Sequence, residues 1–351
     1  MANGDTTPSR AGQINSAGDA NALFLKKFAG EILTTFESNN IFKPLHTMRT
    51  IENGKSAQFP VTGIATASYH TPGENIADAG NSYLSDPKKN EKVITIDDVL
   101  LASSFLSNID DVKNHYDIRS VYSTELGRAL AKRFDIAVAK VFIAAARDAT
   151  PGVTGGNVGA QVDVANNDLS APDSAGTKAA FTGADLTAAL FTAAAKLDNN
   201  DVPSEGRFCV LNPTDYYRLI TGASGALSVS TSASNKDVGG SGSLASGTIP
   251  QVAGIDIYKS TNIPSTDLSS TVTGDGAASN DVFGSSGSGY NGDFRNTVGI
   301  VAHPSAVGTV KLLDLATESE YQIERQGTLF VAKYAMGHGI LRGECALELV
   351  A

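Results

Sequence analysis

The stretch VKNHYDIRSVYSTELGRALAKRFDIAVAKVFIAAARD, residues 112–148, contains no proline and repeats apolar side chains every three or four residues. The stripe consists of Ile118, Tyr122, Leu126, Leu130, Phe134, Val138 and Val141. A helix of this length would measure roughly 50 Å at 1.5 Å per residue, which is longer than an ordinary domain core. The sequence therefore predicts one long helix within residues 108–149, bracing an elongated molecule.

A two-stranded excursion is predicted immediately before this helix, over residues 53–107. Asn53-Gly54 is typical of a tight turn, and the residues from 55 to 70 read as a strand with polar and apolar side chains alternating at its start. A tip rich in Gly, Asn, Asp and Pro follows, and the β-branched run Lys92–Asp97 leads back towards the helix. Because a two-stranded ribbon is marginally stable alone in water, we expect its faces to lie on another surface.

An arm is predicted at the start of the chain, over residues 1–52. Residues 1–20 are polar and unpatterned, and apolar side chains then recur at helical spacing through about residue 37. The sequence therefore predicts a loose tail followed by an amphipathic helix.

After the long helix the chain mixes both kinds of secondary structure. A helix is predicted at 183–199 and a short one after Asn212-Pro213, and the stretches 222–248 and 265–292 are Gly/Ser-rich loops without core-forming content. The predicted strands are Arg207–Leu211, Gly254–Tyr258, Val298–Ala302, Val307–Leu313, Tyr321–Tyr334 and Ile340–Val350. This order is not doubly wound and indicates an α+β fold.

Charge and cysteine content exclude several classes of protein. The net charge is −10, with 27 basic and 37 acidic residues, which disfavours a protein that grips nucleic acid phosphates or an anionic membrane. Two cysteines cannot build a disulfide framework, and no run of about 18 apolar residues is long enough to span a bilayer. We expect neither secretion nor membrane insertion, and we expect synthesis in a reducing cytoplasm.

The motifs that could carry chemistry do not meet the requirements of their sites. Gly54-Lys55-Ser56 has the letters that end a phosphate-binding loop, but Arg49 stands where an earlier glycine is needed and Pro60 opposes a following helix. The five histidines are scattered, and no pair has metal-ligand spacing on one helix. We therefore predict no catalytic residue, no cofactor and no metal. Two alternatives stay open, a nucleotide-binding cytosolic enzyme that uses Gly54-Lys55-Ser56 and a surface-lattice protein.

Six short segments, in order along the chain, carry a family resemblance. They are Gly54-Lys-Ser-Ala-Gln-Phe-Pro-Val61, Pro72-Gly-Glu-Asn75, Glu91-Lys-Val-Ile-Thr-Ile-Asp97, Asn114-His-Tyr-Asp-Ile-Arg-Ser120, Ser305-Ala-Val-Gly-Thr-Val-Lys-Leu312 and Ala332-Lys-Tyr-Ala-Met-Gly-His-Gly339. With similar spacings, they resemble the major capsid protein of T-seven-like short-tailed bacteriophages (podoviruses). The resemblance extends from about residue 22 to 343.

The resemblance implies the Hong Kong 97-type phage capsid fold. That α+β fold has an N-terminal arm, an extended β-hairpin loop, a long spine helix, and peripheral and axial domains. In this sequence the implied parts are the arm with its amphipathic helix at 1–52, the extended loop at 53–107, the spine at 108–149, the axial domain at 150–302, peripheral return strands at 303–337, and a C-terminal strand rejoining the axial domain at 338–351.

The function implied is that of a shell protein, located in the virion and assembled in the host bacterial cytoplasm. Its implied partners are other copies in hexamers and pentamers, a scaffolding protein and a portal at one vertex, around double-stranded DNA that it encloses without sequence-specific binding. There is no implied membrane partner. Within the extended loop, the residues we expect to contact a neighbouring subunit are Phe59, Val61, Ile64, Tyr69, Glu74, Lys88 and Lys89.

Overall fold

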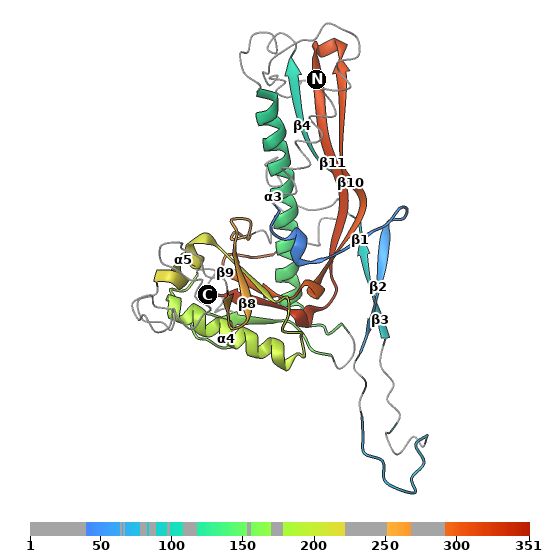
Figure 1. Cartoon of the computed structure of the whole chain (residues 1–351), viewed down its shortest axis with the longest axis vertical. Coiled ribbons are helices and arrows are strands. Elements are labelled where there is room, and N and C mark those ends of the chain that lie inside the picture. Colours follow the sequence, from blue (N-terminus) through green and yellow to red (C-terminus); the bar gives the residue numbers. More distant parts are fainter. Residues whose placement is uncertain are drawn as a thin grey trace.

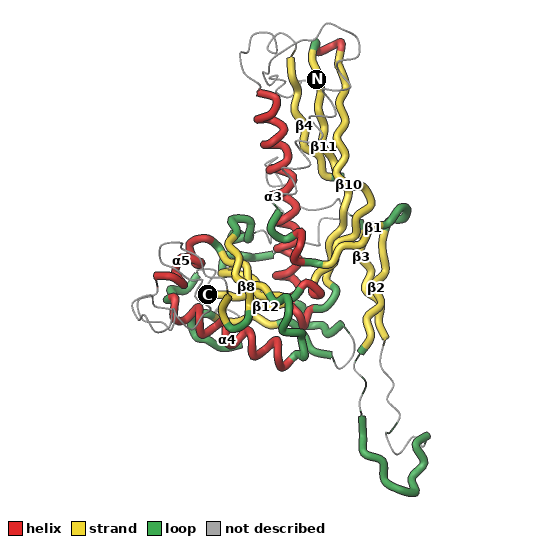
Figure 2. The backbone as a smooth tube through the Cα atoms, in the orientation of Figure 1, coloured by secondary structure: helices red, strands yellow, loops and turns green. Residues whose placement is uncertain are grey.

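A computed structural model of the chain shows an elongated molecule with a long helix, three sheets and a projecting hairpin (Figure 1). It describes residues 40–63, 65, 67–77, 83, 89–96, 99–107, 118–152, 156–169, 178–221, 251–267 and 292–351. The amphipathic helix predicted before residue 38 and the Gly/Ser-rich stretch 222–248 lie outside the described residues, as does most of 265–292. Mixed helices and sheets confirm the α+β prediction (Figure 2).

The long helix is confirmed as α3, Ile118–Arg147. Its 30 residues correspond to roughly 45 Å. Leu130, Phe134, Val138 and Val141 of the predicted face are all buried, and they belong to the main hydrophobic core. The first residues of the predicted range, 108–117, lie outside the described part of the chain.

A four-stranded sheet runs alongside α3 (Figure 1). Its strand order is β1 (Thr47–Thr50), β10 (Val307–Gln322), β11 (Gly327–Ile340) and β4 (Leu100–Ser107). β1 is parallel to β10, whereas β10, β11 and β4 pair antiparallel. Contacts between α3 and β4, β10 and β11 place this sheet against the helix.

Two predicted ranges are wrong at this sheet. The predicted strand Tyr321–Tyr334 is broken by the turn Ile323–Gln326, which joins β10 to β11. That turn has no Gly, Pro or Asn, and Gln326 adopts a left-handed φ of 51°, so it lacks the usual sequence signal. The range 53–107 is not a single two-stranded excursion either, because Leu100–Ser107 pairs with β11, a strand more than 200 residues later.

The hairpin proper is a separate two-stranded sheet, β2 (Ser56–Thr62) and β3 (Lys89–Thr95). Its strands are antiparallel, with Ala57 opposite Ile94 and Phe59 opposite Lys92. Figure 1 shows the loop between them extending away from the rest of the molecule.

A six-stranded sheet forms the other part of the molecule. Its strand order is β5 (Ala160–Asp163), β12 (Ala346–Val350), β9 (Thr297–Ala302), β6 (Phe208–Leu211), β8 (Ile255–Lys259) and β7 (Gln251–Val252). Every residue of β6, β9 and β12 is buried, so both faces of the central strands are covered. The C-terminal part of the chain thus contributes strands to both large sheets.

Two helices accompany this sheet, α4 (Gly183–Asn199) and α5 (Pro213–Thr221). α4 begins with a capping box, in which the Thr182 hydroxyl accepts from the Asp185 N–H and the Asp185 carboxylate accepts from the Thr182 N–H. Short 3-10 turns lie at Lys43–Leu45, Pro304–Ala306, Ile323–Arg325 and Gly343–Cys345.

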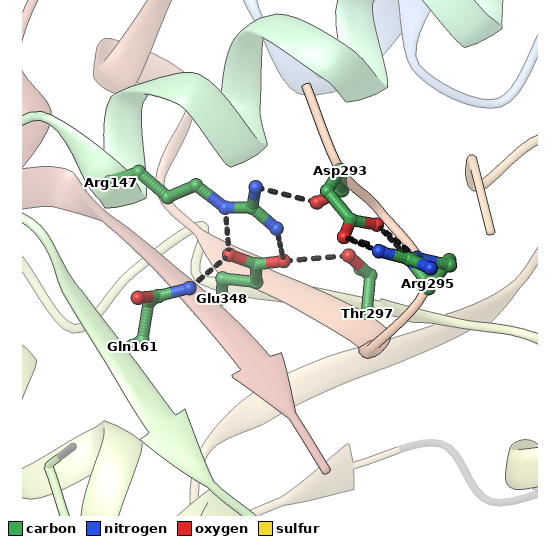
Figure 3. A network of polar contacts seen from close by, with 6 residues as sticks. All are labelled: Arg147, Gln161, Asp293, Arg295, Thr297 and Glu348. Carbon is green, nitrogen blue, oxygen red and sulfur yellow. Dashed lines mark hydrogen bonds and ion pairs between the residues drawn. The ribbon is translucent and has the colours of Figure 1, made fainter. Parts of the chain in front are cut away.

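An ion pair joins the C-terminal end of α3 to the six-stranded sheet (Figure 3). Arg147 donates from Nε and Nη2 to the two carboxylate oxygens of Glu348, each at 2.6 Å, and from Nη1 to the Asp293 carbonyl at 2.7 Å. Gln161 and Thr297 also donate to the Glu348 carboxylate, which is fully buried. A cation in the last turn also suits the negative end of the helix dipole.

A second buried carboxylate ties the start of the described chain to α3. Asp135 accepts from the backbone N–H groups of Ile41 at 3.0 Å and Phe42 at 3.3 Å. It also accepts from the side-chain amide of Asn262 at 3.1 Å. Burial raises the pKa of Asp135, and these donors oppose that effect.

The imidazole of His338 on β11 is buried between the four-stranded sheet and α3. Its Nδ1 lies 2.8 Å from the hydroxyl of Thr309, and its ring packs nearly perpendicular to the ring of Phe134, which also contacts His46. Burial, together with the nearby His46, lowers the pKa of His338 from 6.5 to about 3.

We predict that His338→Gln makes subunit stability less dependent on pH. Because the folded-state pKa is below the unfolded value, the unfolded chain binds more protons, and the free energy of unfolding falls as pH drops from about 6.5 towards about 3. One such group contributes at most roughly 1.4 kcal/mol per pH unit to the change in the free energy of unfolding. The His338→Gln variant should lack this contribution to the slope. Urea denaturation of unassembled subunits from pH 7 to pH 4 measures the slope. The exposed His70→Gln is the control, and an unchanged slope in His338→Gln would contradict the prediction.

Candidate inter-subunit contact surface

Three glycines allow the hairpin to cross the four-stranded sheet at very short range. We call Gly308, Gly337 and Gly339 the glycine seat. A Cβ at Gly337 would lie 2.0 Å from the Thr95 carbonyl oxygen, and one at Gly339 would lie 2.7 Å from a side-chain carbon of Ile94. Since real Cβ atoms do not approach other atoms so closely, β3 can lie here only against glycine.

A small apolar cluster holds the hairpin on the glycine seat. Ala57 and Ile94 of the hairpin are buried with Val310 and Leu341, and three partly buried residues pack against them, namely Ile51, Phe59 and Ile96. Burying an aliphatic side chain of this size contributes roughly 1.5–3 kcal/mol. The root of the hairpin is therefore fixed by contacts within its own chain.

Side chains of β2 become more exposed with distance from the root. Ala57 is buried, whereas Phe59 and Val61 are half-buried. The guanidinium of Arg49 lies 5.5 Å from the centroid of the Phe59 ring, and it donates to the Gln58 carbonyl. Further out, Asn90 opposite Val61 donates to the Gly152 carbonyl at 2.7 Å.

These contacts change our expectation for two of the predicted contact residues. We expected Phe59 and Val61 to need a neighbouring subunit, but both are already partly covered by their own chain. The reason is that Phe59 packs against the cluster that contains Val310 and Leu341, and Val61 lies close to Gly152, and a local reading of the hairpin contains none of these residues. Ile64 and Lys88 lie outside the described residues. Lys89 is exposed at the first position of β3, opposite Thr62.

The described part of the hairpin loop, residues 67–77 and 83, is here called the tip. Tyr69 is completely exposed and Ile76 is 53% exposed, although both side chains are large and apolar. Between them the chain turns at Gly73, which has a φ of 97°, and the Glu74 N–H donates to the Thr71 carbonyl. The tip is therefore a hydrogen-bonded turn that exposes apolar side chains. Figure 1 shows its backbone far from the root of the hairpin.

Tyr69 and Glu74 lie in an exposed loop, as the sequence predicts, whereas Ile76 and Tyr83 were not among the predicted contact residues. Tyr83 is half-buried in a tip whose other described residues are almost all exposed. Its partners come from the opposite limb of the loop, so residue spacing gave no signal for them.

The geometry at Gly54-Lys55-Ser56 does not form a phosphate-binding loop. Gly54 makes a turn with a φ of 118°, and β2 rather than a helix begins at Ser56. The Lys55 carbonyl accepts from the Ile96 N–H at 2.9 Å, which closes the hairpin. A phosphate-binding loop needs a helix after the turn, because the N–H groups of the helix N-terminus converge on the phosphate. Here a strand follows the turn instead.

Two absences among the described residues bear on other classes of function. No group of three or more His, Cys, Asp or Glu among them could hold a metal ion. None of the helices in the described ranges is long and apolar enough to cross a membrane.

Comparison with protein families and curated sequences gives one consistent result. The family model described as "Gp10A-like: Major capsid protein" matches residues 58–350. The chain is 33% identical over 341 residues to the "Major capsid protein" of Escherichia phage T7, covering 96% of this chain and 94% of that protein. It is 35% identical over 344 residues to the "Major capsid protein" of Enterobacteria phage T3, covering 97% and 94% of the two chains.

Comparison with solved structures agrees. A chain from the "Capsid structure of the Cyanophage P-SCSP1u" superimposes with a TM-score of 0.72 at 39% sequence identity, covering 99% of each chain. A chain from the mature capsid of bacteriophage PhiM1 superimposes with a TM-score of 0.65 at 18% identity, covering 89% of this chain and 86% of that one. At that identity the second match indicates a shared fold.

We predict that Gly337→Ala destabilises the attachment of the hairpin. The new methyl group would collide with the backbone at Thr95 and Ile96, so β3 must shift, and overpacking of this kind costs about 1–3 kcal/mol. Chemical denaturation of unassembled subunits measures the total loss, and hydrogen exchange at residues 94–96 locates it. Gly152→Ala is the matched control, because its methyl group would lie 3.8 Å from Val61, an ordinary contact distance. Equal stability of the two variants would contradict the glycine seat.

Proposed function

This chain belongs to the Gp10A-like family of major capsid proteins, and from this membership we propose that its copies build an icosahedral phage head around double-stranded DNA. It is a shell-forming structural protein and not an enzyme, with the Hong Kong 97-type capsid fold. One observation carries the proposal furthest. The hairpin has a root fixed on its own chain and a tip whose apolar Tyr69 and Ile76 are exposed.

The proposed division of the chain keeps the limits given by the resemblance with three changes, two of which are that β1 of the arm and residues 338–340 of β11 belong to the peripheral sheet. The arm comprises 1–52 and the spine 108–149, and the four-stranded sheet with the spine makes up the peripheral domain. The six-stranded sheet, from residues 150–302 and the C-terminal strand, makes up the axial domain. The extended loop ends before β4 at Leu100, because β4 pairs with β11 in the peripheral sheet.

The proposed partners follow from shell assembly. Copies of the chain associate as hexamers and pentamers, a scaffolding protein assists assembly in the host cytoplasm, and a portal occupies one vertex. The net charge of −10 supports a wall that encloses DNA without gripping it, since tight binding of phosphates requires basic surface. Such a wall would let DNA be packed and released.

The proposed inter-subunit contact lies at the outer part of the extended loop. Tyr69 and Ile76 supply apolar surface, and Glu74 and Lys89 supply charges that can set register with a neighbour. Identical contacts repeated at every interface stabilise a shell even when each is weak.

We predict that replacing residues 66–88 by a short Gly-Ser turn leaves the subunit folded but abolishes shells. The root cluster and the glycine seat lie outside the deleted segment, so α3 and both large sheets keep their contacts. Circular dichroism of the purified variant measures the helix, and electron microscopy with sedimentation measures particles.

A second variant separates loop length from side-chain chemistry. A Gly-Ser segment of equal length in place of residues 66–88 should also fail to assemble, because the apolar side chains of the tip are missing. Normal particles from either variant would contradict a role for the tip in assembly. If the unaltered protein stayed a monomer or dimer with its scaffold present, the shell function itself would be contradicted.

A further inference from the structure

The hydroxyl of Tyr83 closes the tip of the extended loop. It accepts a hydrogen bond from the Thr71 N–H at 3.1 Å and donates to the carboxylate of Glu74. The Thr71 hydroxyl oxygen lies 3.3 Å from the hydroxyl oxygen of Tyr83. The Tyr83 ring packs on His70 with ring centroids 5.1 Å apart, and His70 donates from Nε2 to the Glu74 carbonyl at 2.9 Å. We call His70, Thr71, Glu74 and Tyr83 the tip clamp.

The tip clamp fixes the turn that carries the exposed apolar side chains. Thr71 and Tyr83 are 12 residues apart, so their hydrogen bond ties the outgoing limb of the loop to the returning one. Tyr69 and Ile76 flank the clamped turn, and the Asn75 carboxamide accepts from the Ala77 N–H at 3.0 Å to hold Ile76 within a second turn. The contacts of the tip clamp are therefore made among residues of the tip itself.

A loop that is ordered before it docks loses less conformational entropy when it docks. Each backbone or side-chain torsion that becomes fixed lowers the conformational entropy of a free segment. A preformed segment has already lost this entropy on folding, so docking does not remove it again. The glycine seat fixes the direction of the hairpin root, and the tip clamp fixes the shape of its end. Together they present Tyr69 and Ile76 in a defined arrangement.

We propose that Tyr83 is a positioning residue that preforms the tip as a docking element for a second copy of this chain, with Tyr69 and Ile76 as its apolar anchors. This inference rests on the proposed shell function. A second copy is the occupant that fits, because a projecting tip on one subunit and a receiving surface elsewhere on the next form a heterologous contact that every copy repeats. The small apolar area of two side chains suits a contact whose strength comes from repetition.

Tyr83→Phe tests the clamp, because it removes the hydroxyl and keeps the ring against His70. We expect unchanged circular dichroism and an unchanged unfolding midpoint. We also expect about a five- to tenfold rise in the protein concentration at which shells form, consistent with the net contribution of one hydrogen bond per subunit. Light scattering and electron microscopy of the full-length protein measure assembly without scaffold and with it.

Variants at Glu74 separate positioning from a direct contact with the neighbour. Glu74→Gln keeps an oxygen that accepts from Tyr83, so any loss of assembly in this variant measures the charge of Glu74 alone, whereas Glu74→Ala also removes the partner of the Tyr83 hydroxyl and should assemble less well than Glu74→Gln. The double variant Tyr83→Phe with Glu74→Ala should lose less than the sum of the two single variants, because both remove the hydrogen bond between Tyr83 and Glu74. Additive losses would mean that the two side chains act separately and would overturn the proposal.

The remaining outcomes distinguish this inference from the function on which it rests. Shells of unaltered protein together with equal assembly of Tyr83→Phe would overturn the clamp and leave the shell function intact. A defect of Tyr83→Phe seen only when scaffold is present would identify the scaffolding protein as the occupant and overturn docking to a second copy. Absence of shells from unaltered protein under every condition would contradict the proposed function itself.

Discussion

The close crossing of β3 over β10 and β11 is the constraint on which the arrangement of this subunit depends. Side chains alternate between the two faces of a strand, so Gly337 and Gly339 turn one face of β11 to the hairpin while His338 faces Phe134 of α3. One short segment thus attaches the hairpin on one side and the spine on the other. Any side chain larger than hydrogen at the two glycines would separate hairpin from sheet.

A buried ion pair makes the corresponding attachment at the other end of α3. Arg147 and Glu348 form a bidentate pair whose remaining hydrogen-bonding capacity is used by Asp293, Gln161 and Thr297 (Figure 3). Removing Arg147 from such a pair costs about 3–5 kcal/mol, because the charge of the fully buried Glu348 stays without compensation. The spine is therefore joined firmly to both large sheets, while the loop tip is the part of the described hairpin that reaches furthest from them.

The candidate contact surface could be predicted only in part from the sequence. A polar, Gly- and Pro-rich loop between two strands indicates an exposed excursion, and Tyr69 and Glu74 are exposed there. Phe59 and Val61 look equally exposed in the local pattern, yet both are half-buried, Phe59 against the cluster that contains Val310 and Leu341 and Val61 close to Gly152. Tyr83 has no signal at all, because its importance comes from loop closure.

Local physical chemistry was sufficient for the long helix, the helix at 183–199 and the turn at Asn53-Gly54, because helical periodicity, capping and turn chemistry act over a few residues. The family resemblance needed only the likeness of six short segments of the sequence. Pairings distant in the sequence needed the folded chain. Leu100–Ser107 reads as the end of a hairpin but joins β11, and the reversal at Ile323–Gln326 occurs without a turn-forming residue, because the long antiparallel pairing of β10 with β11 holds it. The same holds for Gly337-His338-Gly339, where the sequence shows a distinctive motif, but its roles on two opposite faces exist only when the hairpin and α3 pack against β11.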